Sequence, residues 1–164
     1  MSANLTEGIV RWWDELGNLA RGFRSAALTG IGRMGERLTL AYERDRTGQE
    51  PLWQSIESSF SGYDVLSVVS ATDSTPMPIE VKASELRLKD ACFYVSANEW
   101  ESAQQARAHT FHVWRVGEQP QLAIIGVEQL APHVSANKGD GLWQSLKVPY
   151  FSFRSLFMHV PTKP

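Results

Sequence analysis

The chain has 164 residues, of which 43% are hydrophobic and 21% charged, and its formal net charge is -2. This size fits one compact domain rather than two, and the charge balance excludes a uniformly basic, indiscriminate nucleic-acid binder. A single cysteine, Cys92, excludes an intrachain disulfide framework, and no apolar run reaches the roughly 18 residues of a membrane span, so we expect a cytoplasmic protein.

The first predicted element is an extra N-terminal helix from about Leu5 to Leu28, because apolar residues recur there at three-to-four spacing. The pair Thr29-Gly30 is expected to interrupt that pattern. A second helix is predicted from about Ile31 to Arg46, with Gly48 and Pro51 ending it. Its expected apolar stripe consists of Ile31, Met34, Leu38 and Ala41. We therefore divide the chain into residues 1–30 and a domain over residues 31–164.

Strands are predicted next. Leu52–Ile56 is a weak candidate and Tyr63–Val69 a stronger one, since it is rich in β-branched residues. The Ser, Thr and Pro residues of Asp73–Pro78 predict a hairpin loop. Ile79–Lys82 alternates apolar and polar residues, as a half-buried strand does, and Phe93–Val95 is a further short strand.

The last third of the chain continues this mixture. Ser96 and Glu99 have the spacing of a capping box, which predicts a helix from Ser96 to about Ala108. Closing strands are expected at Phe111–Val116, Leu122–Val127 and Tyr150–Val160. The order of elements predicts a mixed α/β domain with one central sheet.

Glu80 and Lys82 are the first candidate site residues. Residues two apart on a strand share a face, so a carboxylate and an ammonium group are expected side by side. A carboxylate can hold a hard cation such as Mg²⁺, and a lysine can orient water or stabilise charge on a phosphate. The alternative is an ordinary solvated strand face carrying an ion pair.

Asp64 offers a second carboxylate. It stands at the entry of the strand that precedes the Glu80 strand, and a hairpin between the two strands would bring both carboxylates together. Mg²⁺ is usually held by one or two carboxylates together with water and phosphate oxygens. The alternative is a turn residue that binds its own backbone.

Five short blocks in this order resemble the NO VEIN C-terminal domain family, which belongs to the PD-(D/E)xK nuclease superfamily. The resemblance covers residues 32–116 and is carried by Gly32–Glu36, Tyr42–Glu43, Gly62–Asp64, Ile79–Lys82 and Ser96–Trp100.

The resemblance implies a restriction-endonuclease-like core, with a central mixed sheet flanked by helices. It also implies that Asp64 and Glu80 bind Mg²⁺, for which Mn²⁺ can substitute, and that Lys82 is the catalytic lysine. Asp64 follows Tyr63 here, where the superfamily's motif has proline, but that proline is not a ligand. Some members of the superfamily do not cut nucleic acid.

Three further polar residues are weighed for catalysis. Glu36 matches the helix glutamate that reaches the metal in this superfamily, and Glu43 lies on the same flank; the alternative for both is a solvated carboxylate. Gln104 is expected on a packed helix face, from which it would reach the site or cap a strand end. Glu99 is assigned to the capping box. The four histidines lack zinc-site spacing and are expected to be packing or surface residues.

The function expected is that of a Mg²⁺-dependent endonuclease acting on nucleic acid, with DNA favoured, such as the nuclease subunit of a restriction or anti-phage defence system. One alternative is an inactive nuclease-fold module that binds nucleic acid or a partner protein. Another is an adaptor built on the N-terminal helix. The apolar stripe of that helix, which contains Trp12, Trp13, Leu16 and Phe23, also predicts a homodimer or a larger targeting partner.

Overall fold

A long helix opens the part of the chain that the structure describes. The computed structural model describes residues 28–54, 62–134 and 143–161, and residues 28–47 are helical. The predicted interruption at Thr29-Gly30 is therefore wrong, because an exposed glycine in a helix costs only about 1 kcal/mol relative to alanine. The helix ends as predicted at Gly48, which has φ +68°. The N-terminal tryptophan stripe lies outside the described residues.

The buried face of this helix agrees with the predicted stripe only in part: Ile31 and Leu38 are half-buried and pack against the core around Trp114. Met34 is 46% exposed and Ala41 is also exposed, whereas the buried positions recur every four residues and consist of Gly35, Thr39, Glu43 and Thr47. These small and polar residues are buried because the helix lies very close to the sheet. A Cβ atom added to Gly35 would come within 2.8 Å of the Ala83 Cβ atom. The close approach brings the neighbouring Glu36 near the strands.

A six-stranded mixed sheet forms the centre of the molecule. Its strands are β1 (Leu52–Trp53), β2 (Val65–Ser70), β3 (Asp73–Ser84), β5 (Thr110–Arg115), β6 (Gln121–Gly126) and β8 (Met158–His159), in the order β1-β2-β3-β5-β6-β8. Only β3 and β5 are parallel; the other neighbours are antiparallel. Helix, antiparallel strands, helix and parallel strand follow one another as the restriction-endonuclease-like core requires, so the predicted fold class is confirmed.

The predicted hairpin loop at Asp73–Pro78 is wrong, because these residues begin β3. The turn lies directly before β3, at Ala71 and Thr72. Two prolines are tolerated in this stretch of β3 because β5 pairs with β3 only from Ile79 onward, which leaves one edge open before that residue. A proline at an open edge removes no bond from the sheet.

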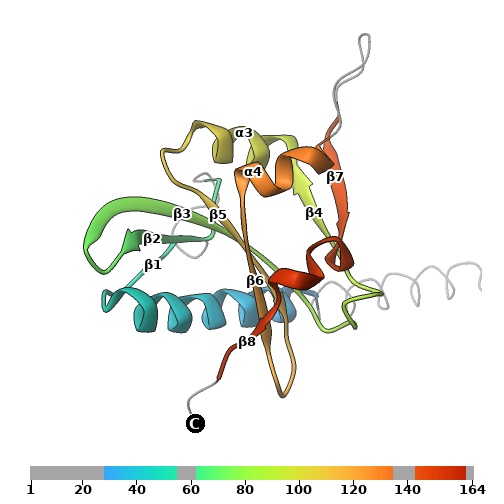
Figure 1. The fold of residues 1–164 in the computed structure, drawn as a ribbon, viewed down its shortest axis with the longest axis horizontal. Coiled ribbons are helices and arrows are strands. Elements are labelled where there is room, and N and C mark those ends of the chain that lie inside the picture. Colours follow the sequence, from blue (N-terminus) through green and yellow to red (C-terminus); the bar gives the residue numbers. More distant parts are fainter. Residues whose placement is uncertain (1–27, 55–61, 135–142, 162–164) are drawn as a thin grey trace, which may run out of the picture.

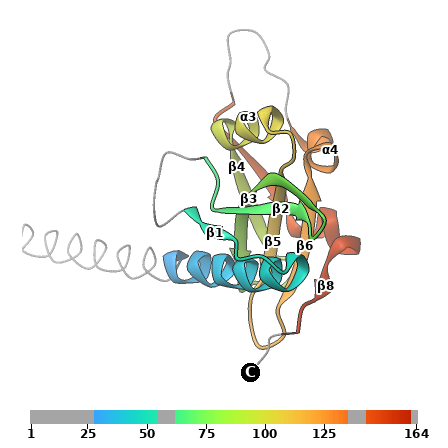
Figure 2. The ribbon, with the colours of Figure 1, turned by 90° about the vertical axis from the view of Figure 1, so that its left-hand side faces the viewer.

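The helix over residues 28–47 covers one face of the sheet, and the remaining elements cover the other (Figures 1 and 2). On the helix side the Trp114 indole donates to the Thr39 hydroxyl at 2.8 Å. The second face carries α3 (Ala97–Gln105), α4 (Val127–Leu130), η1 (Ala131–His133), η2 (Tyr150–Leu156) and a two-stranded sheet of β4 (Cys92–Ser96) and β7 (Ser145–Pro149).

The main hydrophobic core lies between the sheet and this second layer. Phe111 and Ile125 of the sheet pack there with Trp100 of α3 and Tyr150 of η2. The small β4–β7 sheet was not predicted, since the sequence indicated one sheet. The predicted final strand at Tyr150–Val160 is wrong over most of its length: residues 150–156 form η2, and only Met158–His159 joins the sheet.

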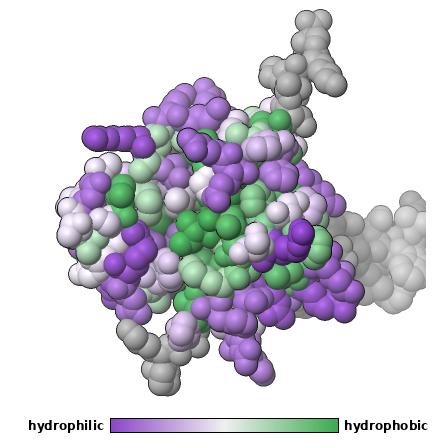
Figure 3. Space-filling view, in the orientation of Figure 1, coloured by the Kyte–Doolittle hydropathy of each residue, from purple (hydrophilic) through white to green (hydrophobic). Residues whose placement is uncertain are grey.

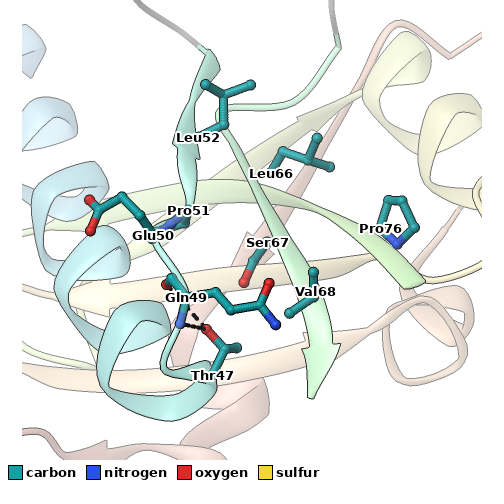
Figure 4. Close-up of a pocket in the computed structure, with 9 residues that line it drawn as sticks. All are labelled: Thr47, Gln49, Glu50, Pro51, Leu52, Leu66, Ser67, Val68 and Pro76. Carbon is teal, nitrogen blue, oxygen red and sulfur yellow. Dashed lines mark hydrogen bonds between the residues drawn. The ribbon is translucent and has the colours of Figure 1, made fainter. Parts of the chain in front are cut away.

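The surface in Figure 3 carries apolar side chains at its centre, surrounded by polar ones. A cavity of about 220 Å³ lies between the end of the long helix and strands β1 and β2 (Figure 4), and a groove of about 750 Å³ separates that helix from β8. Neither is lined by a predicted site residue. Within the described ranges, no helix is long and apolar enough to span a bilayer.

Candidate active site

The site begins where β2 and β3 pair. Val65 of β2 lies opposite Ile79 of β3, which places the preceding residue, Asp64, beside Glu80. Three hydrogen bonds to backbone groups fix Asp64. Its amide donates to the Ile79 carbonyl at 3.0 Å, its carbonyl accepts from the Gln54 amide, and its carboxylate accepts from the Val81 amide at 2.9 Å. The hairpin thus brings the two predicted metal-binding carboxylates together.

Lys82 lies between two carboxylates. Its Nζ atom is 2.8 Å from Oε1 of Glu80 on the same strand and 2.9 Å from Oε1 of Glu99 on α3. The Glu80 side chain is 8% exposed and that of Lys82 is 16% exposed. The predicted side-by-side arrangement is present, but it is not a solvated strand face, because α3 covers it.

Burial sets the charge state of the two carboxyl groups. Burial raises the pKa of Asp64 to about 6, and the nearby Glu36 carboxylate adds to this increase. Burial likewise raises the pKa of Glu80 well above its ordinary range, and the charge of Asp64 adds to it, although Lys82 acts in the opposite direction. The raised pKa values mean that burial opposes ionisation of Asp64 and Glu80, and the Lys82 ammonium group offsets this only in part.

The donor set fits a hard divalent cation. Asp64 and Glu80 supply carboxylate oxygens, the ligand type that Mg²⁺ and Mn²⁺ take in proteins. Their raised pKa values indicate that their negative charge is under-compensated, which a bound cation would relieve. Two carboxylates suffice for Mg²⁺, which keeps water and phosphate oxygens as its other ligands.

Lys82 remains charged. Burial alone would lower the pKa of Lys82, but the carboxylates of Glu80 and Glu99 outweigh burial and raise it. Glu99 shows the opposite balance: burial would raise its pKa, and the neighbouring Lys82 ammonium and the hydrogen bonds to Glu99 lower it. Lys82 can therefore act as a fixed positive charge rather than as a base.

Glu36 reaches the edge of this cluster from the long helix. Its carboxylate accepts from the Trp53 indole and from Arg33 at 2.9 Å, and its side chain is 12% exposed. The charge of Glu36 is felt at Asp64, where it raises the pKa. Glu36 therefore lies on the Asp64 side of the site, and it is not among the main influences on the pKa of Glu80.

Glu43 lies in a different place. It is fully buried, pairs with Arg46 through both carboxylate oxygens and accepts from the Ser67 hydroxyl. Arg46 in turn donates to the carbonyl oxygens of Val68 and Val69. Glu43 is neither solvated nor near Lys82; it joins the long helix to β2 inside the fold.

Gln104 is exposed on α3, whose buried residues are Trp100 and Ala103. The predicted packed position for Gln104 is therefore wrong. Within the described residues it makes no hydrogen bond to Asp64, Glu80 or Lys82. A helix of nine residues buries only a narrow stripe of side chains, so Gln104, which follows the buried Ala103, already faces solvent.

One site residue, Glu99, was missed from the sequence, and His109 is a buried histidine that packs on Phe111, as the sequence predicted. Glu99 forms the predicted capping box, but its other oxygen holds Lys82. His109 precedes β5, is 8% exposed, and has no hydrogen-bond partner for either ring nitrogen among the described residues. Burial lowers its pKa to about 4, against an opposing effect of Glu99. Nothing in the sequence indicates that α3 lies over β3, so the contact between Glu99 and Lys82 could not be predicted from the sequence.

The family model of the C-terminal part of the protein NO VEIN matches residues 35–125, which is more than half of the chain. The chain belongs to the NO VEIN C-terminal family. The match includes every residue of the carboxylate–lysine cluster, which consists of Asp64, Glu80, Lys82 and Glu99, and it ends within β6. The resemblance expected over residues 32–116 is confirmed, although the match begins at residue 35 and continues to residue 125.

Two other comparisons accompany this result. The NO VEIN C-terminal domain described here is similar to the Holliday junction resolvase Hjc of Archaeoglobus fulgidus, with 18% identity over 79% of this chain and 91% of that chain, and a TM-score of 0.47. A comparison with curated proteins finds no match.

Proposed function

We propose that this domain is a divalent-metal-dependent endonuclease that hydrolyses phosphodiester bonds, with DNA as the favoured substrate. The proposal rests on the arrangement of the carboxylate–lysine cluster. Two buried carboxylates on paired strands, Asp64 and Glu80, lie beside a lysine whose Nζ atom is 2.8 Å from Glu80. Burial of three ionisable groups in one place costs free energy, and such an arrangement is typical of a functional site.

Each residue has a role in the proposal. Asp64 and Glu80 would hold Mg²⁺ or Mn²⁺, and Glu36 would bind water at the same place. A bound cation supplies charge neutralisation at the phosphate and lowers the pKa of water. Lys82 keeps its positive charge, so it orients the attacking water and offsets charge on the phosphate oxygens. Asp64 is held by backbone bonds, which keeps its carboxylate in position without a substrate.

The second candidate is a non-cutting module of the same fold that binds nucleic acid or a protein. Two observations favour it: Lys82 is paired with both Glu80 and Glu99, and within the described ranges no three His, Cys, Asp or Glu side chains are grouped as a metal site. A module freed from catalysis has no need for Asp64, Glu80 and Lys82 together, which is why we prefer the nuclease.

A substrate panel tests the proposal. The full chain would be incubated with single-stranded DNA, double-stranded DNA and RNA of the same sequence, with Mg²⁺, with Mn²⁺ and with a chelator. The nuclease proposal predicts metal-dependent cleavage of at least one substrate, fastest on DNA. Binding without cleavage under every metal condition would favour the second candidate.

The setting of the enzyme is proposed by analogy. The setting that we propose is a nuclease subunit of a restriction or anti-phage system in the cytoplasm, acting as a homodimer or with a targeting partner. Light scattering on the full chain at micromolar concentration tests the dimer. A monomeric mass would contradict it.

A further inference from the structure

Building on the proposed function, we propose that Glu99 is a positioning residue that holds Lys82 against Glu80. In this role the start of α3 is part of the catalytic apparatus, although Glu99 touches neither substrate nor metal. The inference deepens the account of the same site and depends on it only for the kinetic part of its test.

The carboxylate of Glu99 contacts the cap of α3, the Lys82 ammonium group and the side chain of Glu80. Its Oε2 atom accepts from the Ser96 amide at 2.7 Å, and its Oε1 atom accepts from Lys82 Nζ at 2.9 Å. The Glu99 amide in turn donates to the Ser96 hydroxyl at 3.2 Å. Since one oxygen is fixed by the helix cap, the other is held in place for the ammonium group. The Glu99 side chain is 26% exposed, so this pairing is shielded from much of the solvent.

Lys82 needs such a partner. A lysine ammonium is a point charge on a flexible four-carbon stem, and one carboxylate leaves it free to rotate. Glu80 alone gives a contact of 2.8 Å on the same strand, whereas Glu99 gives a second contact from across the site. Two contacts from different elements fix the direction of the stem and leave the third N–H available for water.

A helix cap by itself does not require the charge on Glu99. The same chain contains a neutral version of this feature: Gln129 of α4 accepts from the Gly126 amide at 2.8 Å and is exposed. At α3 the equivalent position carries a glutamate turned toward a buried lysine. A glutamine would serve the cap equally well, so the charge is explained by Lys82.

Glu99→Gln in the full chain separates the two roles, because the amide oxygen still caps α3. We expect the melting temperature to stay close to that of the wild type and kcat to fall roughly ten- to hundred-fold, with KM for nucleic acid unchanged. Glu101→Gln is the matched control on the same helix, since Glu101 is exposed and, among the residues that the structure describes, its side chain hydrogen-bonds only to Gln105. Ser96→Ala is the opposite control: it removes the side-chain cap and should lower the melting temperature.

A second measurement does not depend on cleavage. In protein labelled with ¹³C at the lysine ε-carbon, the Lys82 signal is assigned by its loss in Lys82→Met. A held side chain gives two distinct ε-proton resonances. We expect them to merge in Glu99→Gln and to stay distinct in Glu101→Gln.

The two readouts together decide the matter. Merged resonances in Glu99→Gln support the positioning role even if the wild type cuts no substrate, an outcome that would overturn the proposed function alone. Distinct resonances in Glu99→Gln overturn the inference whether or not the rate changes. Merged resonances with an unchanged rate in an active enzyme also overturn it, because Lys82 would then need no positioning.

Discussion

Replacing Asp64 by asparagine should stabilise the metal-free protein at neutral pH. The Asp64 carboxylate is buried beside Glu80, and its pKa is raised from 3.8 to about 6. Ionising it in the folded state therefore costs free energy. Asparagine keeps an oxygen that can accept from the Val81 amide at 2.9 Å, so the variant loses the charge but not the hydrogen bond.

The size of the effect follows from the shift in pKa. A difference of about two units corresponds to at most about 3 kcal/mol, and solvent screening reduces this to about 2 kcal/mol. For a chain of this length that is an increase in melting temperature of roughly 4–8 °C.

The pH window follows from linkage. Between pH 3.8 and about 6 the folded wild type holds a proton on Asp64 that the unfolded chain has lost, so wild-type stability falls as pH rises through this interval. The advantage of Asp64→Asn should be near zero at pH 4 and reach its full value above pH 6.

Urea unfolding of both proteins in a chelator, at pH 4, 5, 6 and 7.5, measures this difference. If the difference in free energy of unfolding between Asp64→Asn and the wild type does not change with pH, the reasoning is wrong. A variant that is less stable than the wild type at pH 7.5 would refute it as well.

The other predictions use the same cluster and its neighbours. Mg²⁺ at a hundred times its Kd should stabilise the wild type by about 2.7 kcal/mol in thermal unfolding and should leave Glu80→Gln almost unchanged; equal stabilisation of both would remove Glu80 from the metal site. Glu36→Gln should slow cleavage about tenfold or more with little change in melting temperature, and an unchanged turnover would remove Glu36 from the active site. Glu43→Ala should destabilise the fold by about 3 kcal/mol because it leaves Arg46 without its buried partner, and a normal urea midpoint would contradict this. Gln104→Ala should change stability by less than about 0.5 kcal/mol and leave the rate unchanged; a slower enzyme would show that Gln104 acts in catalysis.

The sequence predicted the strand pair and the carboxylates on it because those features are local. Alternation places Glu80 and Lys82 on one face whatever surrounds them, and a hairpin can only bring Asp64 back to its own partner strand. The loop expected at Asp73–Pro78 failed for a non-local reason: prolines are acceptable there because β5 begins its pairing later. Which strand edge stays open is decided by the fold.

Features that depend on contacts between layers could not be predicted. The most deeply buried positions of the long helix are Gly35, Thr39, Glu43 and Thr47, while Ile31, Leu38 and Leu40 pack beside them half-buried. Closeness to β3 selects small side chains, and Glu43 pairs with Arg46 and Ser67. Glu99 was assigned to the helix cap because the capping box is complete within four residues. Its contact with Lys82 spans two elements.

Cleavage by Lys82→Met tests the central claim most directly. This substitution removes the ammonium group but keeps a stem of similar length between Glu80 and Glu99, so the site stays filled. The matched control is Lys147→Met, since Lys147 is exposed on β7.

On the best substrate of the panel, with Mg²⁺, the account predicts loss of cleavage by a factor of about a thousand or more in Lys82→Met, with metal binding by calorimetry retained and Lys147→Met unaffected. Wild-type cleavage by Lys82→Met would contradict the assignment of this cluster as the active site.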